Sequence, residues 1–145
     1  MNETEPRVAS FLRSIMAILA LFFALGTLFN NGVALLATDE ALKTLGDIPT
    51  PLFWFDFLMG WGYLFGAIAM FRKKRWAMAL AWTLAVLHSF SASAVWLWFL
   101  TGHPVDQGVL VMVLLREGFW VSVGGLLWKI QPQKPAPPAP KAPPA

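Results

Sequence analysis

Cysteine is absent from this chain of 145 residues, and charged residues make up only 13% of it. Without a thiol there is no CxxC redox pair and no cysteine nucleophile. The two histidines lie in different segments and no HExxH sequence is present, which excludes a zinc site of the metalloprotease type. A GxSxG nucleophile turn is missing as well. The sequence therefore predicts a protein that is not an enzyme and that holds no metal or cofactor.

Hydrophobic residues, by contrast, make up 57% of the chain and gather in four long runs. A soluble domain normally has about twice the charged fraction seen here. A helix of about 20 apolar residues crosses roughly 30 Å of hydrocarbon. The four runs cover residues 8–29, 52–71, 76–100 and 109–130. We therefore expect an all-α integral membrane protein with one four-helix transmembrane domain over residues 8–130.

Basic residues lie on one side of these four expected spans. Nine of the eleven precede or open the first span, connect the second and third, or follow the fourth: Arg7, Arg13, Arg72, Lys73, Lys74, Arg75, Lys129, Lys134 and Lys141. Cytoplasmic loops retain lysine and arginine, so this asymmetry predicts an antiparallel bundle with both termini in the cytoplasm. The chain resembles many small bacterial inner-membrane proteins, and we expect the same multi-pass location. The net charge of +3 then follows from topology and requires no nucleic-acid partner.

The segments outside the spans leave some alternatives open. Residues 33–45 could form a short helix at the outer interface, or the first helix could continue through the two asparagines before them. Cleavage of the first span as a signal sequence after Ala37 is disfavoured, because Leu35 occupies a position where a small side chain is needed. Residues 131–145 hold seven of the eleven prolines, so we expect a disordered cytoplasmic tail. Residues 1–7 are expected to form a short cytoplasmic segment.

Small side chains recur at intervals of four residues in the last three spans. Because lipid removes the hydrophobic drive for helix association, close contact between small residues does much of that work. The predicted packing residues are Gly62 and Gly66 in the second span, Ala77, Ala81, Ala85 and Ser89 in the third, and Gly118 and Ser122 in the fourth. These faces predict a compact bundle, and one of them could instead serve a homodimer.

Four ionisable side chains lie inside the expected spans: Asp56, His88, Arg116 and Glu117. Arg116 and Glu117 are neighbours that project about 100° apart on a helix, so each needs a separate partner. Asp56 is the expected partner of Arg116, since both lie in the outer half of their spans. Glu117 is expected to face His88 or the nearby serines of the third span, or to stay protonated. Haem ligation by His88 is chemically possible, but a hydrogen bond to serine or Glu117 is favoured.

This intramembrane polar cluster has two interpretations. As a structural clasp it would belong to an accessory or scaffold subunit of a membrane complex, whereas as a site it would serve a small transporter or proton-coupled carrier. The four short spans resemble small multidrug resistance transporters in topology only, because those proteins need a glutamate in the first span and this chain has none there. We expect the accessory subunit, with the carrier as the alternative. Charges that face a cavity reachable from one side would favour the carrier.

Overall fold

The structure, a computed structural model, describes residues 7–37 and 50–130. The helices within these ranges are α1 (Arg7–Leu36), α3 (Thr50–Phe71), α4 (Ala77–Leu100) and α5 (Gln107–Ile130). All four are long and apolar enough to cross a membrane. The predicted all-helical fold with four candidate spans is therefore confirmed. Three of the helices begin and end within two residues of the predicted apolar runs.

The first helix is longer than its apolar run. α1 continues through Asn30 and Asn31 to Leu36, so the structure shows the second of the two alternatives for this segment. The buried Asn31 is accommodated because its side-chain amide donates a hydrogen bond of 2.9 Å to the main-chain carbonyl of Thr27. A helix of 30 residues extends about 45 Å, which exceeds the hydrocarbon thickness. The predictions for residues 1–6, 38–45 and 131–145 lie outside the described residues.

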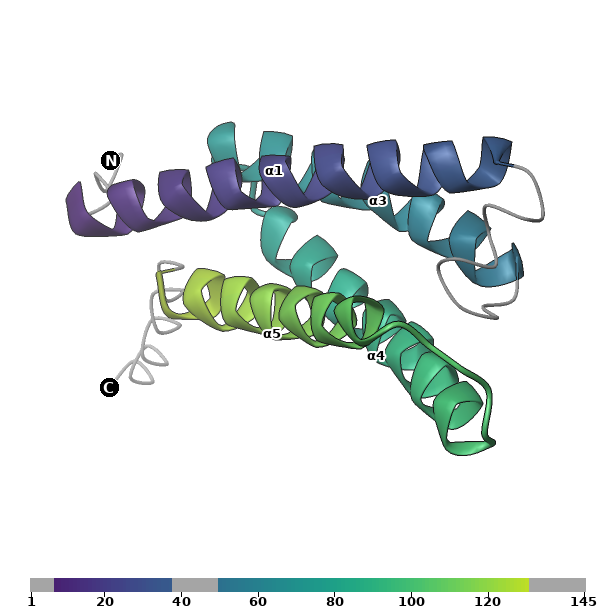
Figure 1. The fold of residues 1–145 in the computed structure, drawn as a ribbon. Helices are drawn as coiled ribbons and strands as arrows, with labels where there is room; N and C mark the ends of the chain where they lie inside the picture. The colour runs from purple at the N-terminus through teal and green to yellow at the C-terminus, as the bar shows by residue number, and fades with distance from the viewer. Residues whose placement is uncertain (1–6, 38–49, 131–145) are drawn as a thin grey trace, which may run out of the picture.

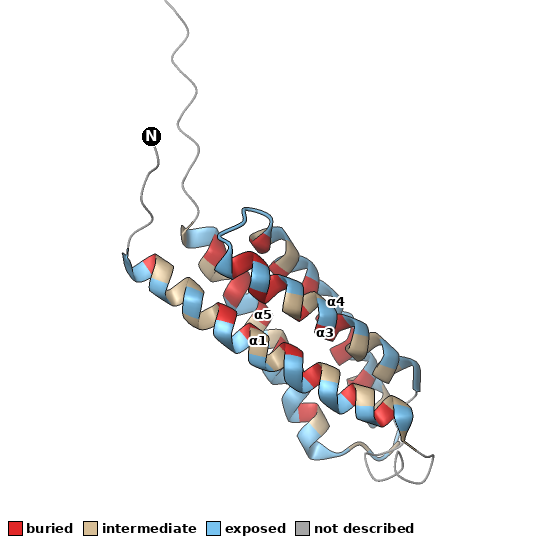
Figure 2. Cartoon of the chain, turned by 90° about the horizontal axis from the view of Figure 1, so that it is seen from above, coloured by how far each residue is buried: buried red, intermediate tan, exposed pale blue. Residues whose placement is uncertain are grey.

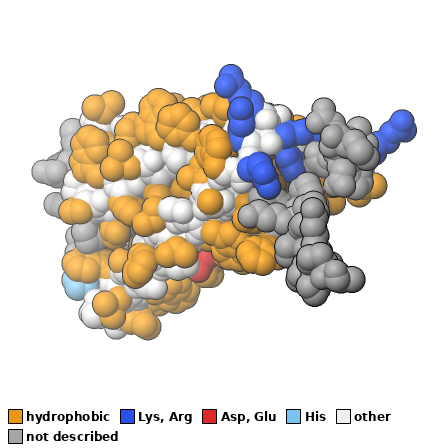
Figure 3. Space-filling model, turned by 180° about the vertical axis from the view of Figure 1, so that it is seen from behind, with side chains coloured by type: hydrophobic (Ala, Val, Ile, Leu, Met, Phe, Trp, Pro, Cys, Tyr) orange, Lys and Arg blue, Asp and Glu red, His pale blue; other side chains and the backbone are white. Residues whose placement is uncertain are grey.

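The helices pack as two pairs, α1 with α3 and α4 with α5 (Figure 1). Contacts within each pair are extensive, whereas α3 meets α4 less closely and α1 meets α5 at only a few places. The connection at residues 72–76 lies beside the start of α1, where Lys73 Nζ donates to Ser10 Oγ at 3.0 Å. Lys and Arg side chains gather at this end of the molecule (Figure 3), which we call the basic end.

Small residues bring α1 and α3 together. The buried residues of α1 recur every three or four positions along one face: Ala17, Ala20, Ala24, Thr27, Asn31 and Ala34. This stripe was not among the predicted packing faces. On the opposing helix, a Cβ atom added to Gly60 would come within 2.9 Å of Leu28 Cγ. Figure 2 shows that the buried residues line the inner faces of the helices.

The predicted small-residue faces of α3 and α4 are in contact with neighbouring helices. Ala77, Ala81 and Ala85 are buried and Ser89 is half-buried. A Cβ atom on Gly62 would lie 2.7 Å from Leu84 Cδ2, and one on Gly66 would lie 2.8 Å from the ring of Trp120. Both glycines therefore allow a large side chain from another helix to approach the backbone of α3.

The packing face predicted on α5 does not meet another described helix of the same chain, and its possible role in a homodimer stays a prediction. Gly118 and Ser122 are exposed, and no described atom lies within 4 Å of a Cβ added to Gly118. Both residues are two positions from Trp120, which is about 200° around a helix at 100° per residue. Because Trp120 is buried, the two small residues point away from the core. The glycine of α5 that lies close to another helix is Gly124, which lies against the ring of Trp82 of α4.

Candidate functional site

A cavity of about 550 Å³ lies between the two helix pairs, on the side away from the basic end. It is lined by the end of α1, the start of α3, the second half of α4 and the first half of α5. The polar part of the lining consists of Asn30, Asn31, Asp56, Ser91, Asp106 and Arg116. Most of the remaining wall is apolar, and the cavity is partly open to the outside. Its volume is in the range typical of small-molecule sites.

Asp56 of α3 and Arg116 of α5 form an ion pair in the lining of this cavity. Arg116 Nη1 donates to Asp56 Oδ2 at 2.9 Å, which confirms the predicted pairing. The side chains are only 8% and 17% exposed, for Arg116 and Asp56 respectively. The ion pair therefore joins one helix of each pair, α3 and α5. Removing one member of such a buried pair typically costs about 3–5 kcal/mol.

The ion pair leaves part of its hydrogen-bonding capacity unused. Asp56 Oδ1 and Arg116 Nε are buried and have no hydrogen-bond partner among the described residues. The same is true of Thr27 Oγ1, which lines, together with Arg116, a second cavity of about 280 Å³ between α1 and α5. Buried polar atoms in proteins are normally hydrogen-bonded, so these three atoms beside the cavities have hydrogen-bonding capacity that the described residues leave unmet.

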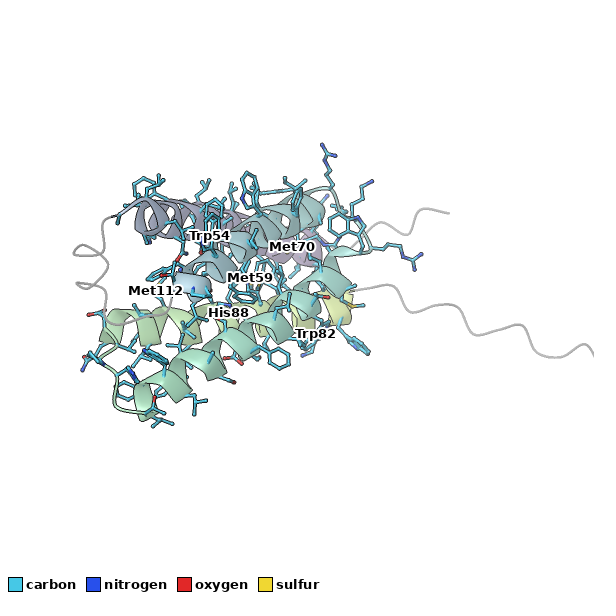
Figure 4. All side chains as sticks on the ribbon, turned by 90° about the vertical axis from the view of Figure 1, so that its right-hand side faces the viewer. Trp54, Met59, Met70, Trp82, His88 and Met112 are labelled. Atoms are coloured by element: carbon cyan, nitrogen blue, oxygen red, sulfur yellow. The ribbon has the colours of Figure 1, made fainter. Side chains whose placement is uncertain are left out.

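Three ring side chains lie beyond the ion pair in the direction of the basic end. Tyr63 of α3 and His88 of α4 are 0% exposed, and Trp120 of α5 is 1% exposed. The Tyr63 hydroxyl lies 3.2 Å from His88 Nδ1, and the rings of Tyr63 and Trp120 are 5.1 Å apart. Figure 4 shows His88 between the helix pairs, near Met59 of α3. We call Tyr63, His88 and Trp120 the aromatic layer; these residues lie on the basic-end side of the ion pair and do not themselves line the cavity.

Glu117 is separate from the ion pair and from the aromatic layer. Its Oε1 accepts a hydrogen bond of 2.8 Å from Ser89 Oγ, so one of the predicted partners of Glu117 is confirmed. The glutamate does not line the cavity and is half-buried, at the outer surface of the α4–α5 pair. His88, the other predicted partner, contacts Tyr63 instead.

The predicted polar cluster is thus divided into three pairs, and of their members Tyr63 was not anticipated. Tyr63 is seven residues after Asp56, which is two helical turns and places both side chains on one face of α3. Thr27 and Asn31 are four residues apart within the small-residue stripe of α1. A search for uncharged polar side chains in phase with the ionisable ones would have found Tyr63.

The side chains that line the cavity offer hydrogen bonds and apolar contacts to a bound molecule. Within residues 7–37 and 50–130, no three His, Cys, Asp or Glu side chains come together in a way that could hold a metal ion. In the comparisons with known proteins, no family model, no curated protein and no solved structure matches this chain. The geometry of the cavity and of the three polar pairs is therefore the basis for a functional assignment.

Proposed function

We propose that this protein is a small, non-enzymatic carrier of the bacterial inner membrane that binds its solute in the cavity beside Asp56 and Arg116. The observation that carries the proposal is that this buried ion pair lines a partly open cavity between two helix pairs that share few contacts. An ion pair in a closely packed bundle would have favoured the accessory subunit instead. Intramembrane ionisable groups at a cavity are typical of solute sites.

The two helix pairs supply the moving parts that a carrier needs. Alternating access is commonly a rocking of one group of helices against another around a central site. Here α1–α3 would move against α4–α5, and the polar links between the two pairs are Asp56–Arg116 and Tyr63–His88. In an antiparallel bundle with cytoplasmic termini the cavity would open toward the outer side, and the aromatic layer would close the cytoplasmic side.

Single cysteines test this arrangement, because the natural chain has none. We expect Val113→Cys, in the cavity lining, to react with a membrane-impermeant maleimide added outside. The matched control is Leu114→Cys, which is at nearly the same depth but exposed on the lipid side and outside the cavity lining. Equal labelling of the two variants would contradict a water-accessible cavity.

A test of movement between the helix pairs needs a second cysteine position, on the other side of the aromatic layer. Ala67 of α3 is 1% exposed and lies one turn past Tyr63 toward the basic end. A carrier visits an inward-open state, so we expect Ala67→Cys to react slowly with the same reagent from the cytoplasmic side, relative to its full reactivity after denaturation. An Ala67→Cys variant that never reacts in the membrane would count against the carrier.

The orientation of the chain in the membrane is tested with cysteines at two further positions. We expect Lys141→Cys to be labelled only from the cytoplasmic side and Thr101→Cys only from the outer side of intact cells. Labelling of residue 141 from outside would reverse the proposed direction of the cavity.

A second candidate, the accessory subunit, is supported by Glu117. A charged side chain in the hydrocarbon costs about 2.5–3.5 kcal/mol on insertion scales, and Ser89 is its only hydrogen-bond partner among the described residues. A partner helix that carries lysine or arginine would neutralise it. We expect such a partner to co-purify in mild detergent with the natural chain and to be lost from Glu117→Gln, with Asp106→Asn as a control. If the natural chain and Asp106→Asn are also purified without any partner, the accessory subunit is rejected and the carrier is retained.

A further inference from the structure

We propose that the cavity binds an uncharged amphipathic molecule whose head group both donates and accepts hydrogen bonds, such as an alcohol or an amide. This inference rests on the proposed function, since it names the class of solute that the carrier would bind. It is carried by the polar atoms of the ion pair, by its charge balance and by the apolar wall above it.

Two side chains of the cavity lining have hydrogen-bonding capacity to spare. Asp56 Oδ1 is an acceptor and Arg116 Nε a donor without a partner within the part of the chain that the structure describes, and both atoms are buried, so a ligand would reach them only when the side chains around the ion pair shift. Ser91 of α4 lines the same cavity and has a hydroxyl that can donate or accept. A head group with one acceptor and one donor, as in an alcohol or amide, therefore complements these groups: its donor can bond to the Asp56 carboxylate and its acceptor to the Arg116 guanidinium.

The ion pair also limits the charge that a ligand can carry. Asp56 and Arg116 neutralise each other at 2.9 Å in a buried position. A cationic head group would compete with Arg116 for the carboxylate, and an anionic one would compete with Asp56 for the guanidinium. Either would leave one member of the buried pair without its counterion, which is strongly unfavourable. A neutral head group can bond to both side chains while the pair remains intact.

The apolar wall of the cavity accommodates the body of the ligand. The lining between the ion pair and the outer end of the cavity includes Phe29, Val33, Leu52, Phe53, Val95 and Met112. An apolar chain placed there leaves water or lipid and gains contacts with these side chains. The cavity of about 550 Å³ is large enough for a molecule with a medium-length hydrocarbon body.

Photolabelling of the full chain in phosphatidylcholine vesicles tests the proposal. The probe is decanol bearing a diazirine in its chain, and labelled positions are read by peptide mass spectrometry. We expect label at cavity positions of α4 and α5 and displacement by decanamide. Decyl sulfate and decyltrimethylammonium carry permanent charges on a chain of the same length and should displace the probe poorly.

Matched variants locate the binding. Val95→Phe fills the cavity, whereas Val86→Phe adds the same ring to the same helix at a lipid-exposed position. Labelling of the cavity should fall by roughly tenfold in Val95→Phe and stay unchanged in Val86→Phe. Val109→Phe, on α5, is the replacement if Val95→Phe fails to elute as a folded species.

Three results would overturn the proposed ligand class. They are even labelling of all lipid-facing residues, displacement by either charged compound at least as strong as by decanamide, and displacement by the zwitterion leucine. The carrier fails separately: specific labelling of the cavity together with an unreactive Ala67→Cys would retain the ligand class and reject transport. A reactive Ala67→Cys without cavity labelling would retain transport and reject the ligand class.

Discussion

The two ends of the bundle are held together by different means. Between the aromatic layer and the basic end, buried side chains from all four helices form one continuous core, with members such as Ala20, Ala67, Ala81 and Val123. On the other side of the layer the helix pairs enclose a cavity, and the main direct polar link across it is the ion pair of Asp56 and Arg116. We refer to these two regions as the packed half and the hollow half.

The difference shows what close packing contributes in lipid. Membrane helices associate through dispersion contacts between closely approaching surfaces, which the small residues of the packed half allow. The hollow half gives up such contacts over the volume of the cavity and depends on a buried ion pair instead. Its stability is thus concentrated in one interaction, whereas that of the packed half is spread over many. Binding sites are commonly found where packing is incomplete.

The largest effect is expected from breaking the ion pair alone. Arg116→Ala leaves the buried Asp56 carboxylate without a counterion and should lower the free energy of unfolding by about 3–5 kcal/mol. The double variant Asp56→Leu/Arg116→Met removes both charges and should recover most of this loss, because apolar replacements of buried pairs are often neutral. Thermal unfolding in detergent, followed by tryptophan fluorescence, measures both. Equal losses in the single and double variants would mean that the uncompensated charge of Asp56 is not the cause of the loss.

A smaller loss is expected when the packed half is disturbed. The Cβ atom of Gly66→Ala would lie 2.8 Å from the buried ring of Trp120, and such overpacking costs about 1–3 kcal/mol. Gly118→Ala is the control, since it makes the same change on α5 where no described atom is close. We expect the control to be neutral or to gain up to about 1 kcal/mol from helix propensity. A destabilised Gly118→Ala would indicate a contact with another chain.

The aromatic layer lies between the two regions, and its hydrogen bond should have a moderate effect. Tyr63→Phe removes the hydroxyl group that lies 3.2 Å from His88 Nδ1, and we expect a loss of about 1–2 kcal/mol. Unfolding of Tyr63→Phe in a His88→Leu background provides the double-mutant cycle. If the tyrosine substitution costs as much without the histidine as with it, the hydrogen bond is not the cause.

The smallest effect is expected at Glu117, which belongs to neither half. Glu117→Gln keeps an oxygen that can accept from Ser89, so the unfolding free energy should change by less than about 1 kcal/mol. The same unfolding assay checks this value. A larger loss would mean that the carboxylate has a structural role beyond its contact with Ser89.

Several features of the site were predictable because they depend on local periodicity and on the cost of charge in lipid. Asp56 and Arg116 lie at similar depth in their spans and neither is stable alone in hydrocarbon, which was enough to predict their pairing. The hydrogen bond between Glu117 and Ser89 was predictable for the same reason, because an isolated carboxylate is costly in hydrocarbon. The orientation of α5 was not predictable, since both Gly118 and Trp120 fit a helix interface and only the surrounding helices decide which of them faces inward.

The amino-acid sequence by itself determined the number and the approximate bounds of the membrane-length helices, because hydrophobic length and helical period are properties of each segment alone. It also determined that the ionisable side chains of these helices need partners. Only the tertiary structure decided that the helices pack as two pairs, that His88 pairs with Tyr63 and that a cavity remains beside Arg116. Cavities and contacts between helices depend on how large side chains such as Trp120 fit against neighbouring backbones, and that fit exists only when the helices are assembled.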